Sequence, residues 1–222
     1  MERSLFSLCL RAVCLFVAVA AASGCASFSA MQTAHTVAEG EVRYAVSLQG
    51  VGGGGAPLSS FEPGVEGSVR YGIAEDWDVG LKLHLLGAQA GAKVQLMRGD
   101  FDLALALEGG YGWVWSAGID APRSHVLVVR LPLLMEQHLH EIVGLTFGPE
   151  LSGVWAVAGA ERGDVYGDTA LYGGGRLGVV LRLLSNLWLM PEVMGQVSLV
   201  GGDSFGSNII WQGGMTFFFG AL

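Results

Sequence analysis

Apolar residues alternate with polar or small residues along most of this chain, from residue 41 to its end. In one such stretch Trp77, Val79 and Leu81 fall on one face, whereas Asp78 and Lys82 fall on the other. Successive side chains of a β-strand point to opposite faces of the sheet, so a period of two indicates strands with one apolar side. The alternation therefore predicts an all-β chain.

Ten segments of this kind follow one another along the sequence. Most of them reach the roughly 9–11 residues that a tilted strand needs to cross a bilayer. Their predicted bounds are 41–50, 60–73, 77–86, 89–97, 101–112, 124–135, 142–155, 168–184, 187–200 and 208–220.

The connections between these segments alternate in length. Those at 74–76, 98–100, 136–141 and 185–186 are short, and most of the others are longer. Membrane barrels have short periplasmic turns and longer outer loops, and an even strand count places both termini beside the short turns. We therefore predict a closed, antiparallel, up-and-down transmembrane β-barrel of about ten strands, with eight to twelve possible and with periplasmic termini.

The composition supports strands rather than helices as the membrane-crossing elements. The chain is 51% hydrophobic and only 14% charged, whereas about a quarter of the residues of a soluble domain are charged. The longest apolar run near the start, residues 12–23, is shorter than the ~20 residues of a spanning helix. The net charge of −8 argues against a nucleic-acid partner.

The amino terminus has the pattern of an export signal. Arg3 and Arg11 precede an apolar stretch at 12–22, as in a secretory signal peptide. Residues 22–25, Ala-Ser-Gly-Cys, resemble a bacterial lipobox, and this resemblance implies that Cys25 is lipidated and begins the mature chain. The alternative is an ordinary signal peptide cleaved after residue 22.

These patterns divide the chain into three parts. Residues 1–24 are the predicted signal peptide, and residues 25–40 are a small, polar tether that carries Cys25. Residues 41–222 are the predicted barrel.

The polar faces of the predicted strands carry both signs of charge, and the apolar faces carry essentially none. A lipid-facing apolar surface with a charged lumen fits this division, because charges paired in a lumen avoid the cost of isolated burial. A soluble, lipocalin-like carrier with the two faces reversed is an alternative. The predicted lumen charges are Glu66, Arg70, Lys82, Lys93, Asp102, Glu108, Arg130, Glu150, Arg176, Arg182 and Glu192.

Aromatic residues gather at the predicted strand ends, as expected of the two aromatic girdles of a membrane barrel. One group lies at the short-turn end: Tyr71, Trp77, Phe101, Trp188, Phe217 and Phe219. The other lies at or near the long-loop end: Phe61, Tyr111, Trp113, Trp155, Tyr172 and Trp211.

The last predicted strand carries Gln212, Gly214, Phe217 and Phe219 in the order polar, glycine, aromatic, aromatic. This pattern resembles the insertion signal of bacterial outer-membrane barrels, although three residues follow the last aromatic. With the alternation, it makes the chain similar to small bacterial outer-membrane β-barrel proteins. The resemblance implies a Gram-negative-type envelope, contact with outer-membrane lipid and insertion by the barrel-assembly machinery.

No motif predicts a cofactor or a catalytic centre. His138 and His140 would share one face of a strand and suit Zn²⁺ or Ni²⁺, but a solvated turn is the favoured interpretation. A surface hydrolase using His125 and Asp203 with a loop serine is an alternative. We expect a structural or surface-interaction barrel whose lumen is narrow or plugged, because about eight strands leave room only for side chains; a small-solute channel is the alternative.

Overall fold

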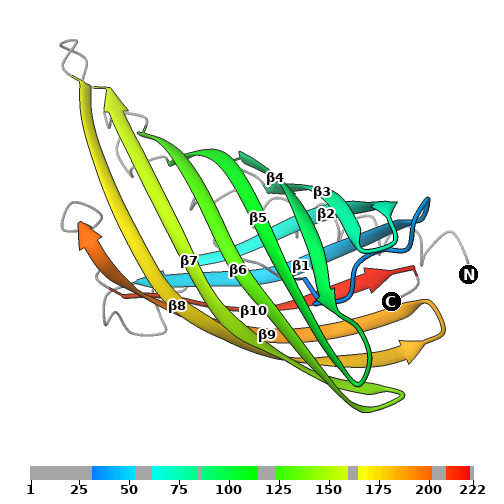
Figure 1. Cartoon of the computed structure of the whole chain (residues 1–222). Coiled ribbons are helices and arrows are strands. Elements are labelled where there is room, and N and C mark those ends of the chain that lie inside the picture. Colours follow the sequence, from blue (N-terminus) through cyan, green and yellow to red (C-terminus); the bar gives the residue numbers. More distant parts are fainter. Residues whose placement is uncertain are drawn as a thin grey trace, which may run out of the picture.

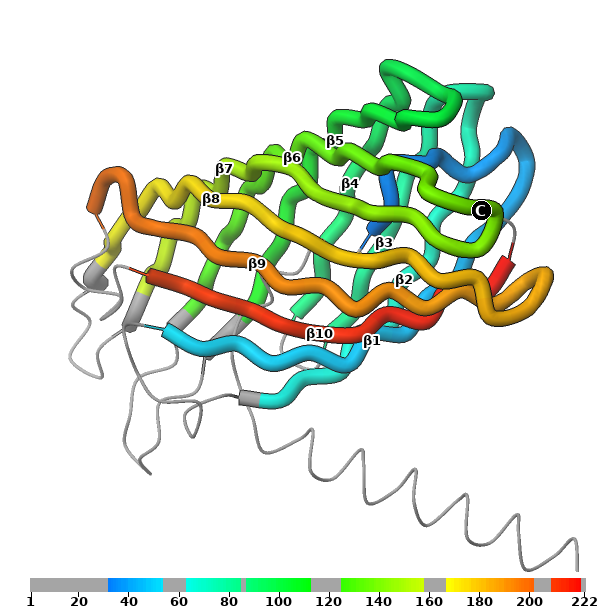
Figure 2. The backbone as a smooth tube through the Cα atoms, turned by 90° about the horizontal axis from the view of Figure 1, so that it is seen from below, coloured from blue at the N-terminus to red at the C-terminus, as the bar shows by residue number. Residues whose placement is uncertain are grey.

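The computed structural model describes residues 32–53, 62–84, 87–114, 124–159, 165–201 and 209–220. Ten antiparallel strands form a closed barrel in which each strand pairs with its sequence neighbours and β1 pairs with β10 (Figures 1 and 2). This confirms the predicted ten-stranded barrel. The strands are β1 Val42–Gly53, β2 Glu62–Ala74, β3 Trp77–His84, β4 Gly87–Met97, β5 Phe101–Val114, β6 Ser124–His140, β7 Val143–Gly159, β8 Val165–Leu184, β9 Leu187–Gly201 and β10 Ile209–Phe219.

Four tight connections lie at one end of the barrel, which we call the turn end. They are residues 75–76, 98–100, 141–142 and 185–186, and the other connections fall largely outside the described residues, at what we call the loop end. The third turn is shorter than predicted, because β6 continues to His140. Gly220 donates a backbone hydrogen bond of 3.1 Å to Asn186, so β10 also finishes at the turn end (Figure 1).

The strands differ in length, so the barrel wall is uneven. β3 has 8 residues, whereas β8 has 20. In Figure 1, β7 and β8 project well beyond the shorter strands at the loop end. The tall part of the wall is therefore formed by β7 and β8, in the second half of the chain.

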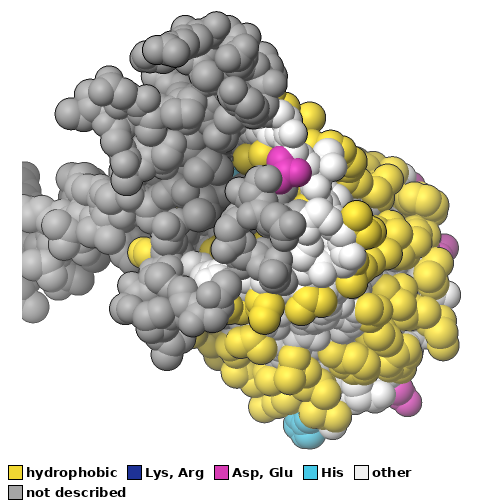
Figure 3. Space-filling model, turned by 90° about the vertical axis from the view of Figure 1, so that its left-hand side faces the viewer, with side chains coloured by type: hydrophobic (Ala, Val, Ile, Leu, Met, Phe, Trp, Pro, Cys, Tyr) yellow, Lys and Arg dark blue, Asp and Glu magenta, His cyan; other side chains and the backbone are white. Residues whose placement is uncertain are grey.

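The outer surface of the wall is apolar. Leu107 is 57% exposed and Val193 is 60% exposed, and the part of the wall visible in Figure 3 is predominantly hydrophobic. Among the described strand residues, no outward-facing position within the wall carries Asp, Glu, Lys or Arg. The alternative of a soluble carrier with an apolar interior is therefore wrong.

Two members of the predicted aromatic girdles face inward instead. Tyr172 is 1% exposed and packs in the lumen with Val154 and Met194. Trp188 is half-buried against a second interior cluster that contains Met190. Both residues occupy inward-facing positions in the alternation of their strands. The alternation therefore decides which way the aromatic side chain faces, even near a strand end.

The lumen contains apolar residues as well as charges. An apolar cluster fills the half nearer the loop end: Val126, Val128, Val154, Ala170, Tyr172, Met194 and Ile210. Smaller clusters lie toward the turn end, one around Met190 and Phe218 and one around Ala104 and Leu134. Over the described residues, no helix has the length and hydropathy to cross a membrane.

Candidate functional site in the lumen

Residues 32–40 form a segment that we call the plug (dark blue in Figure 1). Residues 32–37 lie inside the turn end of the barrel, and residues 38–40 are exposed at its entrance. Gln32, Thr33, Ala34, Thr36 and Val37 are each at most 3% exposed. The sequence predicted a small, polar tether for 25–40, and the described part of that range packs against the lumen wall. The reason is that short polar side chains and backbone amides find partners on the charged lumen wall.

The plug enters the barrel at Gly40 and Gly72. The Gly40 amide donates to the Gly72 carbonyl at 2.9 Å, and the Gly72 amide donates to the Glu41 carbonyl at 3.1 Å. Gly40 has a φ of 79°, in the left-handed region that glycine adopts without strain. A Cβ added to Gly72 would lie 2.5 Å from the Val37 carbonyl oxygen and closer still to that of Ala38. The chain therefore passes against β2 where only glycine fits.

Cations on the wall hold the carbonyl groups of the plug. The Lys93 ammonium donates to the carbonyls of Thr33 at 3.0 Å and His35 at 2.7 Å. Arg43 also donates to the His35 carbonyl, at 3.3 Å. Arg176, from the opposite part of the wall, donates to the Gln32 carbonyl at 3.1 Å. Hydrogen bonds to charged groups contribute more than neutral ones, so these contacts fix the path of the backbone.

Carboxylates and an amide oxygen on the wall accept from the plug. Glu136 accepts from the Ala34 amide at 3.3 Å, and Asp78 accepts from the Val37 amide at 3.0 Å. Deeper in the lumen, Glu108 accepts from the Gln32 side chain at 2.9 Å. Gln95 accepts from both the amide and the hydroxyl of Thr36, at 3.0 and 2.8 Å. Together with the bond from Gly40 to Gly72, these contacts join the plug to seven strands, β1 to β6 and β8.

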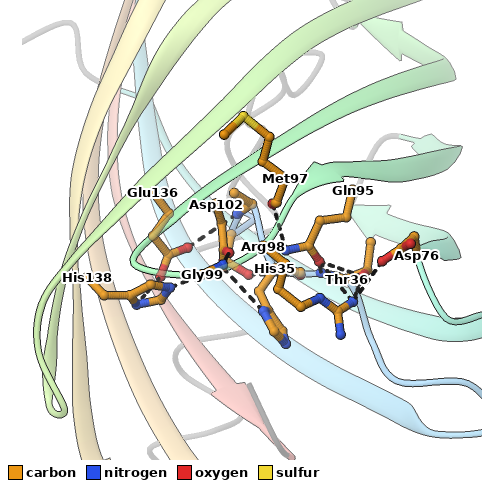
Figure 4. Close-up of polar contacts among 12 residues, drawn as sticks. His35, Thr36, Asp76, Gln95, Met97, Arg98, Gly99, Asp102, Glu136 and His138 are labelled. Atoms are coloured by element: carbon orange, nitrogen blue, oxygen red, sulfur yellow. Dashed lines mark hydrogen bonds and ion pairs between the residues drawn. The ribbon is translucent and has the colours of Figure 1, made fainter.

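Two imidazoles and two carboxylates form a chain beside the plug (Figure 4). Asp102 lies 3.3 Å from His35 Nδ1 and 3.0 Å from His138 Nε2, and the Gly99 amide donates to it at 3.0 Å. The other ring nitrogen of His138 lies 3.9 Å from Glu136. These residues border an open cavity of about 470 Å³ at the turn end. Burial, and next the nearby Arg43 charge, lowers the pKa of His35 below its ordinary value of 6.5.

The His138 side chain takes part in hydrogen bonding, with Asp102 as its partner. Within the described ranges, no three His, Cys, Asp or Glu side chains are placed to share a metal ion. His140 is exposed at the last position of β6. Arg98, in the neighbouring turn, donates to Thr36 at 3.2 Å and to the Glu75 carbonyl at 2.9 Å. The turn at 98–100 therefore also helps to hold the plug.

A belt of ion pairs crosses the middle of the lumen. Arg130 is 1% exposed and donates to Glu150 at 2.8 Å and to Glu108 at 3.2 Å. Gln196 also donates to Glu150, at 2.8 Å. Arg176 lies 3.4 Å from a carboxylate oxygen of Glu192 on the adjacent strand. Each buried charge of this belt therefore has an opposite charge close by.

Further charges and amides fill the remaining lumen wall. Asp78 pairs with Arg70 at 2.7 Å and with Lys93 at 3.3 Å. Gln49 donates to Glu66 at 2.6 Å. A cavity of about 30 Å³ remains between the plug and strands β1 to β5 and β10, whereas a water molecule needs about 10–15 Å³. This cavity therefore has room for only a few water molecules.

The two signs of charge are unevenly distributed around the wall. The inward charges of β1 to β4 are mainly cationic: Arg43, Arg70, Lys82 and Lys93, with Glu66 and Asp78. Those of β5 to β9 are mainly anionic: Asp102, Glu108, Glu136, Glu150 and Glu192, with Arg130 and Arg176. The plug lies between these two sides and bonds to both.

All the predicted lumen charges except Arg182 line the lumen. Arg182 is exposed at the end of β8, with its guanidinium 5.2 Å from the centre of the Trp188 ring. Arg182 keeps the inward position expected from the alternation, since it pairs with inward-facing Trp188, but it lies exposed at the rim of the barrel and not in the enclosed lumen. The predicted set omitted Arg43, Asp78 and Glu136, whose inward positions in the alternation were a usable signal.

The remaining predicted residues fall in several places. Gln212 is 3% exposed and hydrogen-bonds to Gln49 across the seam between β10 and β1, whereas Phe219 faces outward. Gly214 and Phe217 lie in β10. His125 faces outward and pairs with Tyr111 at 2.5 Å. Cys25 and Asp203 lie outside the described residues, so their predicted roles stay predictions.

A closed antiparallel barrel with an apolar exterior and a charged, occupied lumen defines a transmembrane β-barrel. No protein-family model matches the chain, and no curated protein matches it in sequence. Among solved structures, Neisserial surface protein A is similar, with 11% identity over 81% of this chain and 95% of its own, at a TM-score of 0.45.

Two further solved barrels resemble the chain at a similar level. The attachment invasion locus protein of Yersinia pestis, in complex with the heparin analogue sucrose octasulfate, has 12% identity over 80% of this chain and 96% of its own, at a TM-score of 0.42. The translocator domain of the autotransporter NalP from Neisseria meningitidis has 10% identity over 80% and 88%, at a TM-score of 0.40.

Proposed function

We propose that this protein is a bacterial outer-membrane barrel with a sealed lumen, and that it acts as a structural or surface-interaction element and not as a solute channel. The observation that carries the proposal is the plug, whose groups bond to seven strands of the wall. A segment held by so many charge-assisted hydrogen bonds stays in place.

The proposed orientation follows the general form of outer-membrane barrels. Such barrels have short turns in the periplasm and longer loops outside, so the turn end and the plug are assigned to the periplasmic side. The residues between strands at the loop end are then the surface available to partners outside the cell. The pattern of Gln212, Gly214, Phe217 and Phe219 supports assembly by the barrel-assembly machinery.

The buried belt supports a closed lumen independently of the plug. Passage of a hydrated ion would require separating Arg130 from Glu108 and Glu150, and an unpaired buried charge costs about 3–5 kcal/mol. Above this belt, the apolar cluster around Tyr172 and Met194 has few groups that can hydrate a solute.

Single-channel recording in a planar bilayer tests the proposal. We expect no conductance steps from protein shown by protease protection to be folded and inserted. Reproducible steps from the unmodified protein would overturn the sealed barrel and make the small-solute channel the better description.

Lipidation of Cys25 is a separate part of the proposal. The mass of the purified mature protein distinguishes a lipidated Cys25 from an ordinary cleaved terminus. In either case we expect a Cys25→Ala variant to remain in the outer membrane, because the strands themselves cross the bilayer. Release of this variant into the soluble fraction would contradict strand-based anchoring.

A further inference from the structure

A shallow groove of about 470 Å³ runs over the outer surface of β3 to β7 toward the loop end. Outward-facing side chains form its sides, and we call it the Gly109 groove. Its principal lining residues are Leu81, Ala90, Gly109, Tyr111, Leu127 and Trp155.

Small residues form the floor of the groove and large ones form its sides. Ala90 and Gly109 are paired on adjacent strands, and a Cβ built on Gly109 would meet no atom within 4 Å. Leu127 and Trp155 are likewise paired, and they are 52% and 42% exposed. A depression with apolar sides therefore interrupts the otherwise continuous apolar surface.

A polar pair lies beside the groove at the loop end. The Tyr111 hydroxyl and His125 Nδ1 are 2.5 Å apart, and the two rings stack with centroids 5.9 Å apart. His125 Nε2 takes no part in this bond. A tyrosine and a histidine beside an apolar surface provide hydrogen-bonding groups of the kind that occur at a membrane–water interface.

We propose that the Gly109 groove binds one acyl chain of a phosphate-bearing membrane lipid, whose headgroup lies against Tyr111 and His125. The inference rests on the proposed function, which places these strands in a bilayer. The groove is continuous with the lipid-facing wall, and none of its lining residues is charged. Because the loop end is assigned to the outside of the cell, the bound lipid belongs to the outer leaflet.

The physical basis is packing and not transfer from water. A bilayer chain is already in an apolar medium, so it gains nothing further from leaving water. An unfilled depression in the wall, however, loses dispersion contacts, and a chain that fits into it recovers them. Selection among lipids then depends on the polar groups at the Tyr111–His125 end.

Native mass spectrometry of the full protein, purified from phosphatidylglycerol vesicles into mild detergent, tests the inference. The test variant is Gly109→Leu, which fills the groove. Gly67→Leu and Gly195→Leu are matched controls, because both glycines face outward and a Cβ on either meets no atom within 4 Å. We expect one retained lipid on the unmodified protein and on both controls, and at least about tenfold lower occupancy on Gly109→Leu.

Two further arms identify what is recognised. Diacylglycerol, which lacks the phosphate, should be retained less than phosphatidylglycerol, and His125→Phe should remove this difference. Equal lipid occupancy in Gly109→Leu and the two controls would overturn the inference. A dimer of the unmodified protein that is lost in Gly109→Leu would also overturn it, since a second copy would then occupy the groove.

The outcome is separable from that of the proposed function. Protease protection and heat-modified gel mobility establish that each variant is folded, and the conductance recording tests the sealed lumen. A folded, non-conducting protein that retains no lipid would overturn the groove proposal alone.

Discussion

Replacing Gly72 by alanine tests whether the plug is held as described. A Cβ at this position would overlap the carbonyl oxygens of Val37 and Ala38, which are backbone atoms of the plug. The clash cannot be relieved by turning a side chain, so the segment has to move away from β2. Gly72 therefore allows the plug to be disturbed by a single methyl group.

The size of the effect follows from the hydrogen bonds at the entry of the plug. Displacement breaks the bonds from Gly40 to Gly72 and from Gly72 to Glu41, and each contributes about 0.5–1.5 kcal/mol. We therefore expect Gly72→Ala to lower the free energy of unfolding by about 1–3 kcal/mol. If Lys93 also loses its hydrogen bonds to the carbonyls of Thr33 and His35, each lost bond adds about 1.5–3 kcal/mol, while Lys93 keeps its ion pair with Asp78.

The assay is urea unfolding of the protein in lipid vesicles, with bilayer conductance measured in parallel. Gly67→Ala is the control, because Gly67 lies in the same strand, faces outward and has open space around it. We expect the control to be neutral or more stable by about 0.4–1 kcal/mol, as for glycine-to-alanine changes at unstrained positions. If the two variants had the same free energy of unfolding and neither showed conductance steps, the close packing of the plug against β2 would be refuted.

Two other predictions concern charges. Arg130→Met leaves two buried carboxylates without their shared cation and should lower the free energy of unfolding by about 3–5 kcal/mol. Arg182→Met removes only an exposed cation–π contact and should lower it by about 0.5–1 kcal/mol. Similar losses from the two variants would contradict the buried belt. The pKa of His35 lies below 6.5 in the folded chain, because of burial and the Arg43 charge, so its stabilising contribution is present at neutral pH and is lost as the pH falls through this lowered pKa. Plug protection against protease should therefore weaken as the pH falls below 6.5. A His35→Gln variant whose pH profile matches that of the unmodified protein would show that another group is responsible.

The barrel could be predicted because alternation is a local property. Each strand needs only its own period of two, and the charges inside follow from the same parity, as with Glu66 and Arg130. Parity also shows why Tyr172 faces inward, although its position near a strand end suggested a girdle. The alternation does not show how far a position lies from the rim, and Arg182, which pairs with inward-facing Trp188, is exposed at the end of β8.

The plug could not be predicted because its structure depends on partners far away in the sequence. Gln32 bonds to residues 76 and 144 positions further along the chain, and Ala34 bonds to a residue 102 positions further along. Small polar residues are equally typical of a free tether and of a segment that fills a charged lumen. Only the closed barrel, which brings Glu108, Glu136 and Arg176 around one space, distinguishes the two.

The position of the plug has a consequence for the order of assembly. Residues 32–40 precede every strand in the sequence, yet Arg176 of β8 is among the groups that bind them. The complete set of these hydrogen bonds can therefore form only when the wall has been built as far as β8, although those to Arg43, Asp78 and Gln95 need only the first four strands. Of the described chain, the part synthesised first thus completes its contacts late, so a plug that lacks them marks a barrel whose assembly is incomplete.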